Sequence, residues 1–450
     1  MAARLVVSLG SFVFAAPALA GPAQPITFTR DIAPILQDKC EACHRPDSMA
    51  PMPLRTYEEV RPWARAIKQR VAARQMPPWH IDRTVGIQRF ENDRSLTDEQ
   101  IDAIIRWVDA GAPQGDPNDM PPPRRWPDDS VWAFAERFGP PDLIIRSPRY
   151  VMPAHGQDAW WKPVVPTGLT EPRWVRAIEI RPTTAKARRI THHAVARLLQ
   201  DDGNDIARAP SFDIAHPPFD ADTIEIGPGL FMEWAVGKQG EIMRPNTGKL
   251  MLPGSKIVWD IHYHAVGEEI PGEVELAVYF YPKGQEPKYR TVLGQLQAIP
   301  GGSKQNLDIP PNSIAVHQGL FVMRQAGRIE NFQPHMHLRG KAMSMEAILP
   351  NGETRMLSLA NFEFNWHLNY IYAADAAPIL PKGTILRFTA WHDNTAANKA
   401  NPDPNQWVGW GERTVDEMAH AWVNITYMSD EDYRAELAKR GPQAASVAAR

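Results

Sequence analysis

Two stretches near the N-terminus carry apolar residues at helical spacing. The first opens with Thr56 and Glu59, the pattern of a capping box, and apolar residues then recur three or four positions apart. The second opens in the same way with Thr97 and Gln100 and runs to Gly111, a residue type that ends helices. These patterns predict a helix over residues 57–74, a second one before Gly111, and a small all-helical domain over residues 21–111.

Beyond residue 130 the period of the pattern changes to two. Short alternating runs, such as residues 257–264, 273–281 and 384–391, are separated by Pro-Gly or Asn-Gly breaks. This pattern is typical of antiparallel β-sandwiches. Because roughly 300 residues exceed one ordinary sandwich, we expect two all-β, jelly-roll-like domains that divide near Pro300-Gly301-Gly302-Ser303.

The remaining segments complete the expected domain organisation. Residues 112–130 are rich in proline, glycine and acidic residues, which is the composition of a linker. The two β domains are then expected at residues 131–300 and 301–430, followed by a C-terminal tail at 431–450. Proline, at 43 of 450 residues, disfavours long helices and agrees with mostly β structure.

The first twenty residues have the pattern of a secretory signal peptide. Arg4 precedes an apolar run over residues 5–16, and Ala18-Leu19-Ala20 forms a small-residue cleavage site before Gly21. An uncleaved membrane anchor is the alternative, but the run is well short of the ~20 residues that span a bilayer. We therefore expect an exported, periplasmic protein that is cleaved near Ala20 and Gly21 and has no transmembrane segment.

Charge and cysteine content narrow the function further. The net charge of -3 gives no reason to expect a nucleic-acid partner.

The two cysteines, Cys40 and Cys43, both lie in the motif Cys40-Glu41-Ala42-Cys43-His44, so no structural disulfide is expected. In such a motif both thiols can bond to the haem vinyl groups while His44 binds the iron, which predicts one covalent haem c and a cytochrome c-like domain. A zinc half-site or a redox dithiol is the alternative.

A sixth haem ligand is expected from the end of the first helix. Met76 lies in Arg74-Gln75-Met76-Pro77-Pro78-Trp79, where the prolines would stiffen the loop. We predict Met76 as this ligand, with Met49 and Met52 as competitors.

The β region contains three histidine clusters. They are His192-His193, His262-Tyr263-His264 and His335-Met336-His337. Residues i and i+2 of a strand share one face, so each of the last two clusters can hold a metal with both rings. The adjacent pair His192-His193 can do so only at a twisted strand end or a bulge. Imidazole alone leaves copper, zinc, iron and nickel open.

The histidine clusters, in their order along the chain, resemble those of a known enzyme family. Residues 132–428 are similar to the copper type II, ascorbate-dependent monooxygenases, the peptidylglycine and dopamine hydroxylating enzymes. The matching motifs are Thr191-His192-His193, Asp260-Ile261-His262-Tyr263, Pro334-His335-Met336-His337-Leu338-Arg339-Gly340 and residues 410–418, which end in Asp416-Glu417-Met418.

The resemblance implies two copper ions with separate roles. His192, His193 and His262 would hold an electron-storing copper, with His264 only a neighbour. His335, His337 and Met418 would hold the copper that binds dioxygen and hydroxylates a C–H bond of a small-molecule substrate. The thioether independently favours Cu(I) over zinc or calcium. A cleft between the two β domains is implied as well.

The fused haem is expected to supply single electrons to the coppers or to relay them. It would replace ascorbate, or it would pass on electrons from ascorbate or from a redox-protein donor.

Two features depart from the family. No cysteine is left for the disulfides of the animal enzymes, and Gln333 stands where the peptide-amidating members have a substrate-binding arginine. The substrate is therefore not expected to be a peptide awaiting amidation.

Two other functions remain open from the sequence. A non-haem iron oxygenase could use His335, His337 and a carboxylate such as Glu417, although this leaves the other histidines unexplained. A non-enzymatic protein could carry electrons or bind copper in the periplasm.

Overall fold

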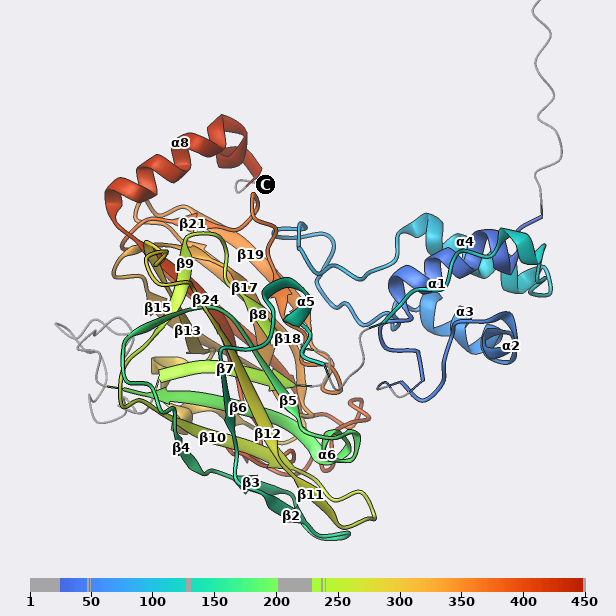
Figure 1. Cartoon of the computed structure of the whole chain (residues 1–450), viewed down its shortest axis with the longest axis horizontal. Helices are drawn as coiled ribbons and strands as arrows, with labels where there is room; N and C mark the ends of the chain where they lie inside the picture. The colour runs from blue at the N-terminus through green and yellow to red at the C-terminus, as the bar shows by residue number, and fades with distance from the viewer. Residues whose placement is uncertain are drawn as a thin grey trace, which may run out of the picture. The chain divides into compact units, whose positions relative to one another are not determined.

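The computed structural model describes residues 25–46, 48, 50–126, 131–200, 229–235, 238 and 240–447, with side chains described up to residue 440. The expected signal peptide therefore lies outside the described residues. Antiparallel strands dominate the rest of the chain, as Figure 1 shows. Contacts divide the chain into a helical unit, which comprises residues up to Ala73 and Leu96–Arg124, and a β unit, which comprises Arg74–Ser95 and the residues from Arg125 onward.

The described residues of the helical unit form helices and no strand. The helices are η1 (Phe28–Ile32), α1 (Ala33–Lys39), α2 (Tyr57–Val60), η2 (Arg61–Trp63), α3 (Ala64–Ala72), α4 (Asp98–Asp109) and η3 (Pro117–Asp119). Both predicted capping boxes are present, at Thr56 and at Thr97. The predicted helix over residues 57–74 is split into three pieces around Pro62, which lacks an N–H for helical hydrogen bonding. Phe28, Leu36, Ile104 and Trp107 are buried in the core of this unit.

The predicted boundary of the helical domain is wrong in two places. Residues 74–95, here called the strap, leave the helical unit and pack on the β unit, because Ile81 and Ile87 are buried in a β core there. The first part of the predicted linker instead belongs to the helical unit. Phe28 N–H donates to the carbonyl of Pro113, and the indole N–H of Trp107 donates to the same carbonyl at 3.0 Å.

The β unit contains two large hydrophobic cores, and most of the predicted strands are confirmed. The elements around the first core are α5 (Ala135–Phe138), β1 (Leu143–Arg146), β2 (Tyr150–Met152), β3 (Ala159–Trp161), β4 (Val164–Pro166), β5 (Arg173–Pro182), α6 (Ala185–Ile190), β6 (Thr191–Leu199), β7 (Gly229–Ala235), β8 (Gly240–Ile242), β9 (Thr247–Met251), β10 (Lys256–Tyr263), β11 (Ile270–Gly272) and β12 (Val274–Phe280). One sheet of this half has the strand order β3-β10-β6-β7.

The second core is formed mainly by residues after 296. Its elements are β13 (Tyr289–Gln297), η5 (Pro300–Gly302), η6 (Lys304–Asn306), β14 (Asp308–Ile309), β15 (Ile314–Val322), β16 (Ala326–Ile329), β17 (Asn331–His335), β18 (Gly340–Ile348), β19 (Thr354–Asn361), β20 (Tyr370–Ile371), β21 (Ile379–Leu380), β22 (Ile385–Asp393), β23 (Val408–Gly409) and β24 (His420–Met428). A sheet with the order β15-β22-β18-β19 covers one side of it.

The two halves share a sheet. Its order is β1-β12-β5-β9-β13-β24-β16-β21, so it runs from the first core into the second. β13 pairs in parallel with β9 and antiparallel with β24. The predicted division near residue 300 therefore separates two cores but not two units, and β13 belongs with the second half.

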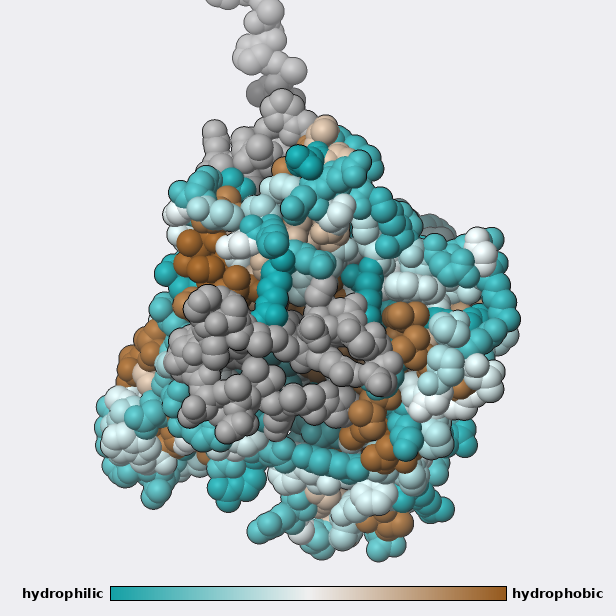
Figure 2. All heavy atoms as spheres, turned by 90° about the vertical axis from the view of Figure 1, so that its left-hand side faces the viewer, coloured by the Kyte–Doolittle hydropathy of each residue, from teal (hydrophilic) through white to brown (hydrophobic). Residues whose placement is uncertain are grey.

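The C-terminal segment is helical where the sequence predicted a tail. α8 (Asp430–Val447) follows β24, and Arg440 donates to the carbonyl of Ala377 at 2.6 Å. Within the described residues every helix is too short or too polar to cross a bilayer. On the face drawn in Figure 2, hydrophobic side chains form several separate groups among hydrophilic ones.

Candidate metal centre

A β-bulge brings two adjacent histidines to the same side of a sheet. His262 on β10 pairs with His193 on β6, but the next residue, Tyr263, pairs with Thr191. The register therefore skips His192, which is the extra residue that lets both neighbouring rings turn toward His262. The ligand atoms of His192, His193 and His262, the first His set, all lie within 4.8 Å of one another.

The hydrogen bonds of the first His set leave nitrogen atoms free for a metal. His262 Nε2 lies 2.8 Å from an Asp158 carboxylate oxygen, and its buried Nδ1 has no hydrogen-bond partner among the described residues. The Nδ1 atoms of His192 and His193 lie 3.1 Å apart. A carboxylate that holds one ring nitrogen and leaves the other free is the common arrangement around metal-bound histidine. Trp160 stacks on the His262 ring at 4.6 Å and fixes its plane.

The second His set consists of His335 and His337, where β17 ends. Their ring centroids are 5.4 Å apart. His337 Nδ1 lies 3.1 Å from the backbone carbonyl of Asp416, so Nε2 of His337 is the nitrogen that could bind a metal. Both rings are buried.

Glu417 holds the backbone around the second His set. Its carboxylate accepts hydrogen bonds from the backbone N–H groups of His337, Arg339 and Met418. Burial raises the pKa of Glu417 to about 7, although these three amides oppose the shift. Since both oxygens are occupied by backbone, Glu417 is poorly placed to be the carboxylate ligand of an iron triad.

Met418 comes from the loop just before β24 and is half-buried. Its carbonyl lies 3.2 Å from His392 Nε2, and His392 is fully buried. His420, two residues after Met418, is the Cα partner of His335 across β24 and β17. The structure therefore brings the Met418 segment beside the second His set.

Two histidines that the sequence analysis did not select join the cluster. The His367 and His420 rings lie 4.7 Å and 4.8 Å from the His335 ring. Neither belongs to an adjacent or alternating pair, so spacing gave no signal for them. The only sequence signal was the position of His420 two residues after Met418.

The two His sets contact each other. The ring centroids of His193 and His335 are 6.2 Å apart, and those of His192 and His367 are 5.7 Å apart. Phe364 packs against His192 and His337 and so touches both sets. The shared sheet joins the two cores, and the implied cleft between two β domains stays a prediction.

The electrostatics of the cluster keep its rings neutral. Burial, followed by repulsion from neighbouring imidazoles, lowers the pKa of His192 to about 4 and that of His193 well below the usual value. Burial also lowers the pKa of His337 to about 4 and that of His367 to about 3. Neutral imidazole is the form that binds metals, so the cluster presents metal-binding lone pairs at neutral pH.

The Cys40 to His44 motif lies on consecutive turns after α1. The N–H groups of Cys43 and His44 both donate to the carbonyl of Cys40. His44 Nδ1 lies 3.1 Å from the carbonyl of Met52, which leaves Nε2 free. Neither cysteine forms a disulfide, and burial raises the pKa of Cys40 to about 12. The residues therefore fit a haem that Cys40 and Cys43 would hold covalently, and His44 Nε2 would be available to bind its iron.

The three methionines considered as the sixth haem ligand have different positions. Met76 belongs to the strap and hence to the β unit, so its pairing with the haem stays a prediction. Met52 packs against the core of the helical unit, as Cys40 does. Met49 lies outside the described residues.

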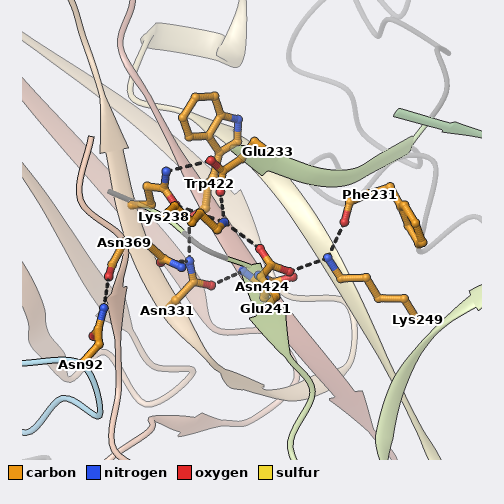
Figure 3. A network of polar contacts seen from close by, with 11 residues as sticks. Asn92, Phe231, Glu233, Lys238, Glu241, Lys249, Asn331, Asn369, Trp422 and Asn424 are labelled. Atoms are coloured by element: carbon orange, nitrogen blue, oxygen red, sulfur yellow. Dashed lines mark hydrogen bonds and ion pairs between the residues drawn. The ribbon is translucent and has the colours of Figure 1, made fainter. Parts of the chain in front are cut away.

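A buried network of charges surrounds Lys238 and Lys249 (Figure 3). Lys238 pairs with Glu233 and Glu241, and Lys249 pairs with Glu241 at 2.7 Å. Gln333, two residues before His335, donates to Glu233 at 2.9 Å. Gln333 is fully buried and committed to this network, so it does not stand in for a substrate-binding arginine.

Comparisons with known proteins leave the family open. No protein-family model and no curated protein matches the chain. A subviral particle of infectious bursal disease virus VP2 is similar at 12% identity and a TM-score of 0.18, covering 64% of this chain and 74% of that one. A structure of the Gx strain of the same virus has 11% identity and a TM-score of 0.18, covering 68% and 75%. These values are too low to carry an argument.

Proposed function

We propose that this protein is an exported, copper-dependent monooxygenase with a covalent haem c on the same chain. The observation that carries the proposal is the buried cluster in which the first His set meets His335, His337 and the Met418 segment. Its orphaned nitrogens, neutral rings and thioether fit copper better than zinc, calcium or magnesium. The family resemblance of the four motifs supports the same metal.

The cluster residues divide the work by their ligand chemistry. His192, His193 and His262 would hold one copper with imidazoles only, and Asp158 would orient His262. His335, His337 and Met418 would hold the other. Bound copper would supply one-electron chemistry and the activation of dioxygen. Glu417 keeps the backbone of His337 and Met418 in one arrangement and is a positioning residue.

The overall reaction defines what must reach the site. Hydroxylation converts a C–H bond and one dioxygen to an alcohol and one water, and it consumes two electrons and two protons. The electrons would come singly, from the haem held by Cys40, Cys43 and His44 or from ascorbate or a redox-protein donor. The ring contact between His193 and His335 would offer a short electron path between metals held by the two His sets.

The alternative functions are weakened unequally. The iron triad loses its carboxylate, because both oxygens of Glu417 accept backbone hydrogen bonds. A non-enzymatic electron-transfer or copper-binding protein would hold the same metals. Only a measured hydroxylation activity distinguishes the proposed enzyme from it.

Rapid mixing tests the proposal. The copper-loaded holoprotein is reduced without oxygen, mixed with oxygenated buffer and small organic substrates, and followed at the haem absorption bands. We expect the haem to reoxidise in a copper-dependent reaction that a substrate accelerates. A haem that stays reduced with copper, oxygen and substrates present would overturn its role as electron feeder.

A further inference from the structure

Alternate residues of β24 carry buried polar atoms that lack a hydrogen-bond partner. These atoms are Asn424 Oδ1, Trp422 Nε1 and both ring nitrogens of His420, and Gln297 Oε1 is in the same state opposite His420 on β13. No described residue forms a hydrogen bond with any of them. Alternate and directly paired residues share one face of a sheet, so these side chains form one line, here called the polar row. Buried polar atoms are nearly always hydrogen-bonded to protein or to ordered water, so the polar row indicates bound water.

One end of the polar row opens into a pocket of the β unit. Asn424 lines this pocket, which contains about 440 Å³ of empty space with its mouth included. Glu91 and Ile242, which are 47% and 36% exposed, also line it, so the pocket is open to solvent. Glu330 and Thr291 add a carboxylate and a hydroxyl to its wall. A polar, open pocket of this size admits water to the Asn424 amide.

The other end of the polar row reaches the second His set. The ring centroids of His420 and Trp422 each lie 4.8 Å from that of His335, and they lie 5.1 Å from each other. His335 also pairs directly with His420 across β17 and β24. The row therefore extends from a solvent-open pocket to a residue of the candidate metal centre, although His335 itself is only 3% exposed.

The buried charge network runs beside the polar row (Figure 3). Gln333 is the Cα partner of Trp422 and donates to Glu233 at 2.9 Å. Lys238 lies 2.9 Å from a carboxylate oxygen of Glu241, which lines the pocket. The side chains of Gln333, Glu233, Lys238 and Glu241 are all buried. A polar interior of this kind holds water, whereas an apolar one stays dry.

We propose that a file of water molecules follows the polar row and carries protons from the pocket to the second His set. This inference rests on the proposed function, which consumes two protons together with two electrons for each dioxygen. A proton that enters at the pocket moves from water to water, because each water donates one proton to the next as it accepts one. Asn424, Trp422 and His420 only orient the waters by hydrogen bonds and keep their own charge.

Indole hydrogen exchange tests whether water reaches the polar row. The full chain with its haem, carrying isotope-labelled tryptophan and no added copper, is transferred to heavy water, and the indole N–H signals are followed by NMR. Trp259 is the matched control for Trp422. It is fully buried and its Nε1 also lacks a partner among the described residues, but it lies in the first hydrophobic core. We expect Trp422 to exchange at least about tenfold faster than Trp259. Equal rates, slow or fast, would overturn the proposal.

Asn424→Leu tests whether the pocket is the inlet. Leucine has a similar volume but no polar atom, and the bond from the Asn424 backbone N–H to Asn331 at 2.7 Å does not depend on the side chain. We expect the exchange of the Trp422 indole to slow at least about tenfold. In the copper-loaded protein we expect unchanged copper affinity, slower reoxidation of the reduced haem by dioxygen, and a larger difference between the reoxidation rates in water and heavy water. Asn424→Ser keeps a hydroxyl and leaves room for water, so it should match the wild type in each measurement.

The outcomes separate this inference from the proposed function. Normal reoxidation in an Asn424→Leu variant whose Trp422 exchange is slowed would show that the row holds water without delivering protons, and would overturn the proposal. Equal losses in Asn424→Leu and Asn424→Ser would show a structural effect and would also overturn it. A wild-type protein that binds no copper, or whose haem is never reoxidised, removes the proposed function and the proton delivery together. The Trp422 exchange rate would still show whether water reaches the row.

Discussion

The rings of His193 and His335 lie 6.2 Å apart although the two residues belong to strands of different hydrophobic cores. β13 of the second half pairs in parallel with β9 of the first half, Tyr289 with Thr247 and Arg290 with Gly248, and this pairing joins the two halves in one sheet. Two coppers held by the two His sets would therefore be neighbours within one protein interior. This relationship underlies the predictions that follow.

Asp158 is expected to control copper binding by the first His set. Asp158→Asn removes the charged partner of His262 Nε2, so the ring is less firmly held with Nδ1 toward the metal. We expect a loss of about 10- to 100-fold in the affinity of one copper, measured by chelator competition. His264→Gln serves as the control, because His264 is outside the three-residue set. An unchanged affinity in Asp158→Asn would contradict this role.

The thioether of Met418 is expected to be needed for hydroxylation. Met418→Leu keeps an apolar side chain of similar volume but removes the sulfur. We expect sulfur scattering at the copper edge to disappear and turnover to fall by about 100-fold or more, with the haem spectrum intact. Met336→Leu is the matched control. Met336 stands between His335 and His337 in the sequence, and its side chain is buried in the second core. Retained turnover in Met418→Leu would refute the assignment.

The copper-free protein is expected to lose stability as the pH falls below neutrality. The His192 ring has a folded-state pKa of about 4 against an ordinary value of 6.5, because burial disfavours its charged form. Between these values the unfolded chain binds protons that the folded chain does not, so acid favours unfolding. We expect a lower melting temperature at pH 5 than at pH 7.5, and a smaller difference in His420→Asn. A melting temperature that rises toward pH 5 would contradict the buried, neutral cluster.

Lys238 is expected to be essential for the folded β unit. Lys238→Met leaves Glu233 and Glu241 buried without their shared cation. Removing one partner of a buried ion pair costs about 3–5 kcal/mol, which denaturant unfolding can measure. Lys288→Met is the control, because the Lys288 pair with Asp432 is exposed and should matter little. Equal stability of the two variants would show that the network in Figure 3 contributes nothing.

Much of the fold followed from local patterns in the sequence. Local sequence predicted two kinds of feature, because each depends only on residues close together in the chain. They are the capping boxes at Thr56 and Thr97 and the alternating runs of β10, β12 and β22. The position of the strap could not be predicted in this way, because Ile81 and Ile87 contact residues of the second core that are far away in the sequence. The proline and acidic residues of 112–124 predicted a linker, but this segment belongs to the helical unit through contacts with residues far away in the sequence.

The candidate metal centre was predictable only where spacing encodes it. The bulge at His192 was foreseen as the condition under which an adjacent pair can converge, and the register shift confirms it. His367 and His420 carry no such spacing, and they reach the cluster through the loop between β19 and β20 and through the pairing of β24 with β17. The commitment of Gln333 and Glu417 to buried hydrogen bonds likewise depends on tertiary neighbours.

The copper content of the haem-loaded protein tests the central claim most directly. Purified full-length protein is saturated with copper, freed of loosely bound metal, and measured for copper and iron per haem together with its EPR spectrum. The account predicts two coppers per haem, no iron beyond the haem, and Cu(II) signals with nitrogen ligands that change in His262→Gln and His335→Gln variants. Iron in excess of the haem, or a protein that retains no copper, would contradict it.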